Sequence, residues 1–486
     1  MIFLRITPIR AEIKYMKRMN LGLALCIMSL PALGYTEDTA VGLKKTQTRH
    51  IQVFDTNVEI GSQDSPIYVA SVNDQLDITV TNQTPTPLTL HWHGLIVPWD
   101  QDGTPYLSQS PIAPGKSYRY TFPLLQTGTF YAHGQYGLEQ QNLMSIPIVI
   151  NEKKELCGST DIVMFLEDFT SQKLDDVLKA LRKEDTPFNM EANLISHCWN
   201  DICLDSYLTN RKTWENPDVY QVKSAETIRL RLINAACATD FLVHFGSLQA
   251  KVIAADGSKV VPLRVTQLPI TMGQRYDVMI TVPSKESDFP IIAQAVGTNQ
   301  STGLILTSNN VENSLVRLHD IPDAKEISNA IEMLLHPLNP LTQRPVDRKL
   351  RLELNGNKKT YKWSINNKPW LQCGPLRVKE GERVELVVHN KTNTAHPIHL
   401  HGHTFQVIGI NNQLFQGPMR DTLLVMPGQI IKVHFDANNP GVWLIDCKHI
   451  YRAWQGMATV LEYEGFEKIK FSPLRNIQYS MLYDPS

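Results

Sequence analysis

The chain has 486 residues, with 47 Lys and Arg against 48 Asp and Glu, a net charge of -1, and 42% hydrophobic residues. This composition is typical of a globular protein and excludes a disordered polymer. A net charge near zero gives no electrostatic reason to expect a nucleic acid or an anionic membrane surface as partner, and the length suits about three domains.

The amino-terminal segment has the order of an export signal. Basic residues between Arg5 and Arg18 precede the apolar run Leu21–Leu30, and the small residues Ala32 and Gly34 offer a cleavage site. The run is too short to span a bilayer, and no later apolar stretch reaches about 18 residues. We therefore predict a signal peptide over residues 1–34 and a periplasmic or secreted mature protein without a membrane span.

One strand-and-turn pattern occurs three times along the chain. The copies at Val72–Asn82, Val222–Asn234 and Val378–Asn390 alternate apolar and polar residues, and each ends in Asn. Such alternation is typical of a half-buried strand that runs into a turn. The repeats therefore predict an all-β protein of three similar domains.

The first and third copies carry histidines at equivalent places. Nine and eleven residues beyond the final Asn stand His91 and His93 in the first copy and His399 and His401 in the third, whereas the middle copy has apolar residues there. On a strand, i and i+2 side chains share one face, and imidazole is a common ligand of copper and zinc. We predict a metal pocket between the first and third domains.

The middle of the chain is less informative. A charged stretch at Ser171–Asp185 is predicted as a solvated helix and loop, and Cys198 and Cys203 are either a small-loop disulfide or two free thiols. A further helix is expected at Ala324–Leu335. The predicted boundaries are 35–152, 153–309 and 349–486 for the three domains and 310–348 for a linker.

Longer motifs surround these histidines. They are HWHGL at 91–95, GTFYAH at 128–133, HPIHLHGHTF at 396–405 and WLIDCKHIYRAWQGM at 443–457. With them the sequence resembles the multicopper oxidases, which include the laccases and the bacterial copper-resistance oxidases. The resemblance implies three cupredoxin-like (plastocyanin-like) Greek-key β-sandwich domains. It also implies a type 1 copper that takes electrons from a phenolic or metal-ion donor and passes them to a three-copper cluster that reduces dioxygen.

The resemblance assigns copper positions residue by residue. The matching residues are His91 and His399 for type 2 copper, His93, His133 and His401 for type 3 copper, and His396, Cys447 and Met457 for type 1 copper.

Four positions depart from the family's pattern. Gln135, Asp446, Lys448 and Arg452 stand where it has His. A guanidinium has only donors and no lone pair for a metal, so the type 1 site is incomplete and electron transfer through Cys447 is in question. Asp446 and Lys448 face the same side of a strand, which suggests an ion pair, with Gln135 nearby, in place of type 3 copper.

The five remaining histidines could hold one or two ions, fewer than the family's four coppers. We expect an exported protein that binds copper there, with the oxygen-reducing cycle impaired or lost. One alternative is an active copper-dependent oxidoreductase, laccase-like or acting on metal ions in copper resistance. A mononuclear oxygen chemistry also stays open, because two His and one carboxylate, here Asp446, are the ligand set of non-haem iron oxygenases. The other alternative is a metal-free scaffold that acts through protein contacts.

Overall fold

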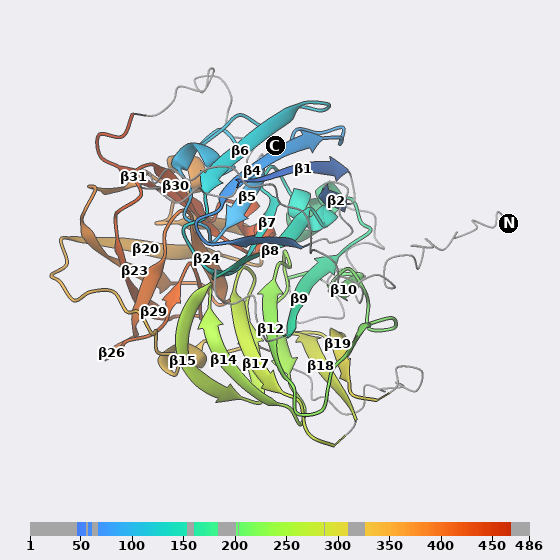
Figure 1. The fold of residues 1–486 in the computed structure, drawn as a ribbon. Helices are drawn as coiled ribbons and strands as arrows, with labels where there is room; N and C mark the ends of the chain where they lie inside the picture. The colour runs from blue at the N-terminus through green and yellow to red at the C-terminus, as the bar shows by residue number, and fades with distance from the viewer. Residues whose placement is uncertain are drawn as a thin grey trace, which may run out of the picture.

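The computed structural model describes residues 46–54, 57–60, 67–152, 160–182, 201–202, 204–285, 287–309 and 326–467. The predicted signal peptide and the Cys198–Cys203 pair lie outside this part of the chain. Strands dominate the described residues and form six sheets, which confirms the predicted all-β class (Figure 1). Within the same residues, no helix has the length and apolar character needed to cross a membrane.

The first two sheets use the strands before residue 152. Their orders are β2-β1-β4-β6 and β3-β8-β7-β5, and Leu76, Ile78 and Phe130 are buried in the core that they enclose. The strands are β1 (Thr46–Phe54), β2 (Asn57–Ile60), β3 (Tyr68–Ser71), β4 (Gln75–Asn82), β5 (Leu90–His93), β6 (Ser117–Pro123), β7 (Gly128–Gly134) and β8 (Ser145–Asn151).

The middle sheets have the orders β10-β9-β12-β17-β14-β15 and β11-β19-β18-β13-β16. Their strands are β9 (Thr160–Phe169), β10 (Ser206–Thr209), β11 (Asp218–Gln221), β12 (Thr227–Asn234), β13 (Phe241–His244), β14 (Gln249–Ala255), β15 (Ser258–Val265), β16 (Gln267–Ile270), β17 (Arg275–Thr281), β18 (Asp288–Ala295) and β19 (Ser301–Thr307).

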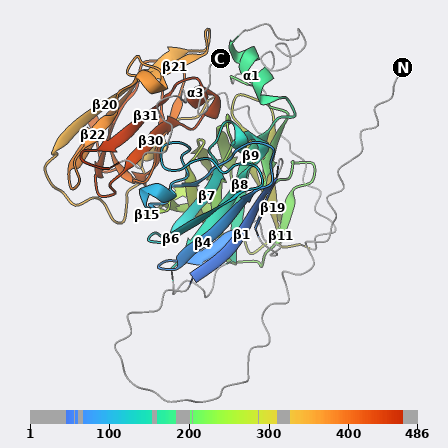
Figure 2. The same ribbon diagram turned by 90° about the horizontal axis from the view of Figure 1, so that it is seen from above.

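The last two sheets have the orders β21-β20-β23-β29-β25-β26, with β27 beside β25, and β22-β31-β30-β24-β28. Their strands, in orange and red, lie to one side of the blue strands of the first domain (Figure 2). They are β20 (Arg348–Asn357), β21 (Lys362–Ile365), β22 (Leu376–Val378), β23 (Arg383–Asn390), β24 (His396–Leu400), β25 (Phe405–Ile410), β26 (Gln413–Leu414), β27 (Met419–Arg420), β28 (Thr422–Val425), β29 (Ile430–Asp436), β30 (Val442–Cys447) and β31 (Ala458–Tyr463).

The same strand order recurs in each domain. The repeat strands β4, β12 and β23 each pair in parallel with one neighbour and antiparallel with the other. In the second sheets, β5, β13 and β24 occupy corresponding places beside β7, β18 and β30. The histidine pairs of the first and third repeats therefore lie on equivalent strands, as their spacing predicted.

The Asn that ends each repeat strand has one structural role. The buried amide of Asn82 donates hydrogen bonds to the carbonyls of Thr86 and Ile112, at 2.7 and 2.8 Å. Asn234 and Asn390 make the same two kinds of bond, one to the following turn and one to a distant segment. A buried amide needs such partners, which explains why the pattern ends in this residue.

The described helices are short. They are α1 (Leu174–Arg182), α3 (Ile450–Trp454), η1 (Trp99–Gln101), η2 (Glu139–Asn142), η4 (Ala330–Met333) and η5 (Trp370–Gln372). The predicted helix after Ser171 is confirmed as α1, but it is not fully solvated, because Val177, Leu178 and Leu181 are buried. The helix predicted at Ala324–Leu335 was wrong over its described part, which contains only the single 3-10 turn η4.

Gly128 at the start of β7 tests the contact between the first and middle domains. It has a φ of 131°, and a Cβ there would lie 2.6 Å from the Gly257 Cα, whereas a Cβ on Gly115, with a φ of 70°, would meet nothing within 4 Å. We expect Gly115→Ala to lower the free energy of unfolding by about 1 kcal/mol through backbone strain. Gly128→Ala should cost about 1–3 kcal/mol more, as measured by urea unfolding. Equal losses would contradict this packing.

Candidate metal centre

Five predicted histidines meet between the first and third domains. His91 and His93 lie on β5 and His133 lies opposite on β7, while His399 on β24 and His401 just after it come from the third domain. Each is at most 1% exposed. The His91 and His401 rings stack with centroids 3.8 Å apart, as do those of His93 and His399. The structure therefore brings all five into one buried cluster.

Hydrogen bonds fix the orientation of three of these rings. His91 Nδ1 lies 2.8 Å from the Asp102 carbonyl oxygen, His399 Nδ1 lies 2.9 Å from the Asp421 carbonyl oxygen, and His401 Nδ1 lies 3.1 Å from the Asp102 carboxylate. Carbonyl and carboxylate oxygens only accept, so Nδ1 carries the proton in each ring. In the neutral rings Nε2 then holds the lone pair.

The three Nε2 atoms fit a metal ion. Each is buried and has no hydrogen-bond partner among the described groups. His91, His399 and His401 each offer one ligand atom within 4.8 Å of the other two. An unsatisfied buried polar atom is costly, and a metal ion would satisfy three at once. Burial disfavours the charged ring of His401, but Asp102 outweighs this effect and raises the pKa of His401 to about 9. A metal ion would therefore displace a proton from that ring.

The other two rings are oriented differently. His93 Nε2 lies 3.1 Å from the Thr422 hydroxyl, and its Nδ1 has no partner among the described groups. His133 Nδ1 donates to the Gly134 carbonyl at 2.9 Å, and its Nε2 accepts a hydrogen bond from Lys448 Nζ at 3.1 Å. Both nitrogens of His133 are thus already engaged within the protein.

The predicted ion pair between Asp446 and Lys448 is wrong in its geometry. Among the described ion pairs within 4.0 Å, Asp446 Oδ1 approaches His401 Nε2 at 3.8 Å, and Lys448 contacts His133 instead. Burial would raise the pKa of Asp446, but Lys448 and His401 hold it well below its usual range. Gln135 lies nearby, as predicted, and lines a cavity of about 20 Å³ with both side chains.

Arg452 lies where the resemblance places a type 1 histidine, and its guanidinium has no lone pair for copper. His396, Cys447 and Met457 are fully buried, and His396 Nδ1 lies 3.9 Å from Cys447 Sγ. Arg452 Nη1 approaches the same Nδ1 at 3.2 Å, so a guanidinium stands where an imidazole ligand is needed. Burial raises the pKa of Cys447 to about 12, which keeps it a thiol, whereas copper binds a thiolate.

Asp201 explains how a charged guanidinium is tolerated there. Its Oδ2 accepts a hydrogen bond from Arg452 Nε at 2.7 Å, and Lys358 and Tyr361 bind the same carboxylate. Burial opposes ionisation, but Arg452, His449 and Lys358 lower the pKa of Asp201. No motif pointed to Asp201, because it lies 251 residues before Arg452 in the chain.

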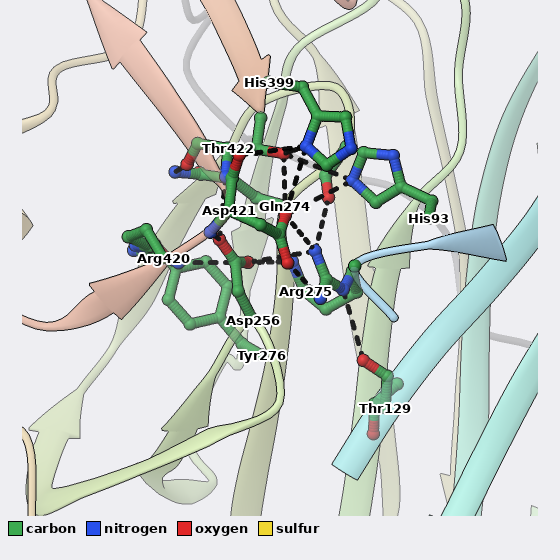
Figure 3. A network of polar contacts seen from close by, with 12 residues as sticks. His93, Thr129, Asp256, Gln274, Arg275, Tyr276, His399, Arg420, Asp421 and Thr422 are labelled. Atoms are coloured by element: carbon green, nitrogen blue, oxygen red, sulfur yellow. Dashed lines mark hydrogen bonds and ion pairs between the residues drawn. The ribbon is translucent and has the colours of Figure 1, made fainter. Parts of the chain in front are cut away.

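A second buried network supports the histidines from the middle domain (Figure 3). Arg275 at the start of β17 donates to both carboxylate oxygens of Asp421 at 2.7 Å. The Asp421 carbonyl orients His399, and its carboxylate lies 3.4 Å from His93 Nε2. Sequence analysis missed both residues. The available signal was the occurrence of charged residues among apolar strands, as in Arg420 at the end of β27 and Asp421 before β28.

Comparisons with known proteins agree with these observations. Family models described as multicopper oxidase match residues 55–155, 160–313 and 343–465, which together make up most of the chain. Multicopper oxidase MmcO of Mycobacterium tuberculosis is 32% identical over 416 residues, covering 82% of this chain and 81% of that protein. The chain belongs to the multicopper oxidase family.

More distant relatives of this multicopper oxidase share its fold and length. Copper resistance protein A of Escherichia coli is 24% identical over 82% of this chain and 87% of that protein. The solved structure of Fet3p, a multicopper oxidase that functions in iron import, has a TM-score of 0.75 at 20% identity, covering 86% of this chain and 91% of that one. The laccase of Botrytis aclada has a TM-score of 0.74 at 22% identity, covering 87% and 88%. The cupredoxin-like, three-domain fold implied by the motifs is thereby confirmed.

The Arg275–Asp421 pair gives a direct test of the second network. Both side chains are fully buried, so Arg275→Met would leave an uncompensated carboxylate. We expect a loss of about 3–5 kcal/mol in the free energy of unfolding, and a smaller loss for Arg275→Met combined with Asp421→Asn. Arg119→Met is the matched control, because its Asp77 pair is 65% exposed at the arginine and should contribute at most about 1 kcal/mol. If Arg275→Met and Arg119→Met lowered the free energy of unfolding equally, the buried pair would contribute no more to stability than the exposed one.

Proposed function

We propose that this multicopper oxidase binds copper in its buried histidine cluster and does not run the four-copper oxygen-reducing cycle. The supporting observation is that His91, His399 and His401 each have a buried Nε2 without a hydrogen-bond partner among the described groups, while a hydrogen bond at Nδ1 orients each ring. Histidine rings fixed in this way by carboxylate or carbonyl partners are typical of metal ligands. Bound copper would supply a one-electron redox couple at this place.

The loss of the cycle follows from the residues around Cys447. Arg452 and Asp201 satisfy each other's charge, so copper gains no second imidazole there. Asp446 and Lys448 replace the imidazoles on either side of Cys447, and Lys448 occupies the lone pair of His133. In this proposal Cys447 is a packed thiol, and electrons from an external donor have no route through it.

An exported copper-binding protein accounts for the remaining features. The order of residues 1–34 is that of a signal peptide, and one relative is named copper resistance protein A. We infer that the protein works in the periplasm or outside the cell and holds copper in a buried place. The proposal predicts no turnover of phenolic donors or metal ions with dioxygen.

The histidine cluster is tested by copper loading. Protein loaded with copper and desalted should retain copper that the His91→Ala, His399→Ala double variant loses, because both Nε2 donors are removed. His434→Ala is the control, since this half-exposed ring on β29 lies outside the cluster and should leave copper content unchanged. Metal analysis per chain gives the result. Equal copper in the wild type and the double variant would reject the cluster as the binding place.

Arg452 is tested by the visible spectrum. A blue band needs thiolate bound to copper, so the copper-loaded wild type should show none. Arg452→His should produce the band, because it restores an imidazole beside His396 and Cys447. Adding Cys447→Ser to that variant should abolish it. A blue wild type that consumes oxygen with a phenolic donor would contradict the proposed function.

A further inference from the structure

Three overlapping groups of side chains could hold an ion in the cluster, and protein cations engage two of them. Each group places three donor atoms within 4.8 Å of one another. The groups are His91, His93 and His133; His93, His399 and Asp421; and His91, His399 and His401. The hydrogen bonds of each group decide which one is open to a metal ion.

Lys448 engages the first group. Its Nζ donates to His133 Nε2 at 3.1 Å, and Gly134 accepts from the other ring nitrogen, so His133 has no free lone pair. The lysine is 2% exposed and is fixed at its backbone, where its N–H donates to the Pro397 carbonyl at 2.7 Å. Its stem packs beside Gly273, because a Cβ built there would lie 3.1 Å from Lys448 Cγ. The amine is therefore held at the ring.

Arg275 engages the second group. It binds both oxygens of Asp421 at 2.7 Å, and the Thr422 hydroxyl donates to one of them at 2.9 Å. This carboxylate is already satisfied by a bidentate, charge-assisted pair. An ion at Asp421 would also lie beside a buried guanidinium and be repelled by it.

The third group has no such competitor. The Nε2 atoms of His91, His399 and His401 have no hydrogen-bond partner among the described groups, and neither does Asp446 Oδ1, which forms a long ion pair with His401 Nε2 at 3.8 Å. Asp446 is 3% exposed. Three imidazoles with an adjacent carboxylate form a donor set for one Cu²⁺ or Zn²⁺ ion, and copper has the higher intrinsic affinity of the two.

We infer that the pocket is a mononuclear copper site formed by His91, His399 and His401. Lys448 excludes a second ion, because its hydrogen bond uses the lone pair of His133 Nε2. This inference rests on the proposed function and specifies the number of ions and their ligands. Asp446 Oδ1, 3.8 Å from His401 Nε2, would lie beside the same ion. Lys448, which stands where the family has His, thus limits the histidine cluster to one copper ion instead of several.

Copper content and the spin count from electron paramagnetic resonance test the inference on the full chain. The wild type should retain one copper per chain. Lys448→Met keeps the apolar stem but frees His133 Nε2 to act with His93 Nδ1, so it should retain two. Lys448→Leu serves as a second variant if the Met variant does not fold, because leucine also lacks a hydrogen-bond donor for His133, and circular dichroism checks each fold. One copper in a folded Lys448 variant would overturn the role of Lys448.

Alanine variants of single histidines test the ligands without disturbing Lys448. His401→Ala should lower copper retention at least tenfold, whereas His133→Ala should leave one copper bound. Loss of copper in His133→Ala, or two coppers in the wild type, would overturn the mononuclear site while leaving the proposed function intact. A wild type that retains no copper would overturn both.

Discussion

The buried ion pair of Arg275 and Asp421 joins all three domains at the histidine cluster. Arg275 comes from the middle domain, which carries none of the five histidines, and Asp421 comes from the third. Through its carbonyl and carboxylate, Asp421 orients His399 and contacts His93 of the first domain. Because both charges are fully buried, neither can be lost alone without a large penalty. The middle domain thus positions the site although it supplies no ligand.

Hydrogen bonds and ion pairs also explain how the chain accommodates three of the four residues that depart from the family's pattern. Arg452 donates a hydrogen bond to Asp201, and Lys448 donates one to His133. Asp446 forms a long ion pair with His401, and the charge of Lys448 also lowers the pKa of Asp446. Buried polar groups persist only under such conditions. In the proposed function, the multicopper oxidase fold is retained while protein side chains fill the positions of its electron path.

The sequence was sufficient for the parts of the structure that depend on local periodicity. The three repeats predicted strands that end at Asn82, Asn234 and Asn390, and the i, i+2 histidines predicted a shared pocket; the structure has both. It was insufficient for contacts between distant segments. Asp201 and Arg275 bind residues more than a hundred positions away in the chain. The alternation of apolar and polar residues on one strand does not predict which residue a charged side chain contacts. That is why Lys448 was assigned to Asp446 rather than His133.

The central claim is that copper occupies the histidine cluster and not the position beside Cys447. Anomalous scattering from a crystal of the copper-loaded full chain tests it most directly. The account predicts one copper peak among His91, His399 and His401 and none between His396 and Cys447. A peak bonded to Cys447 Sγ, or a pair of peaks bridged beside Lys448, would contradict it.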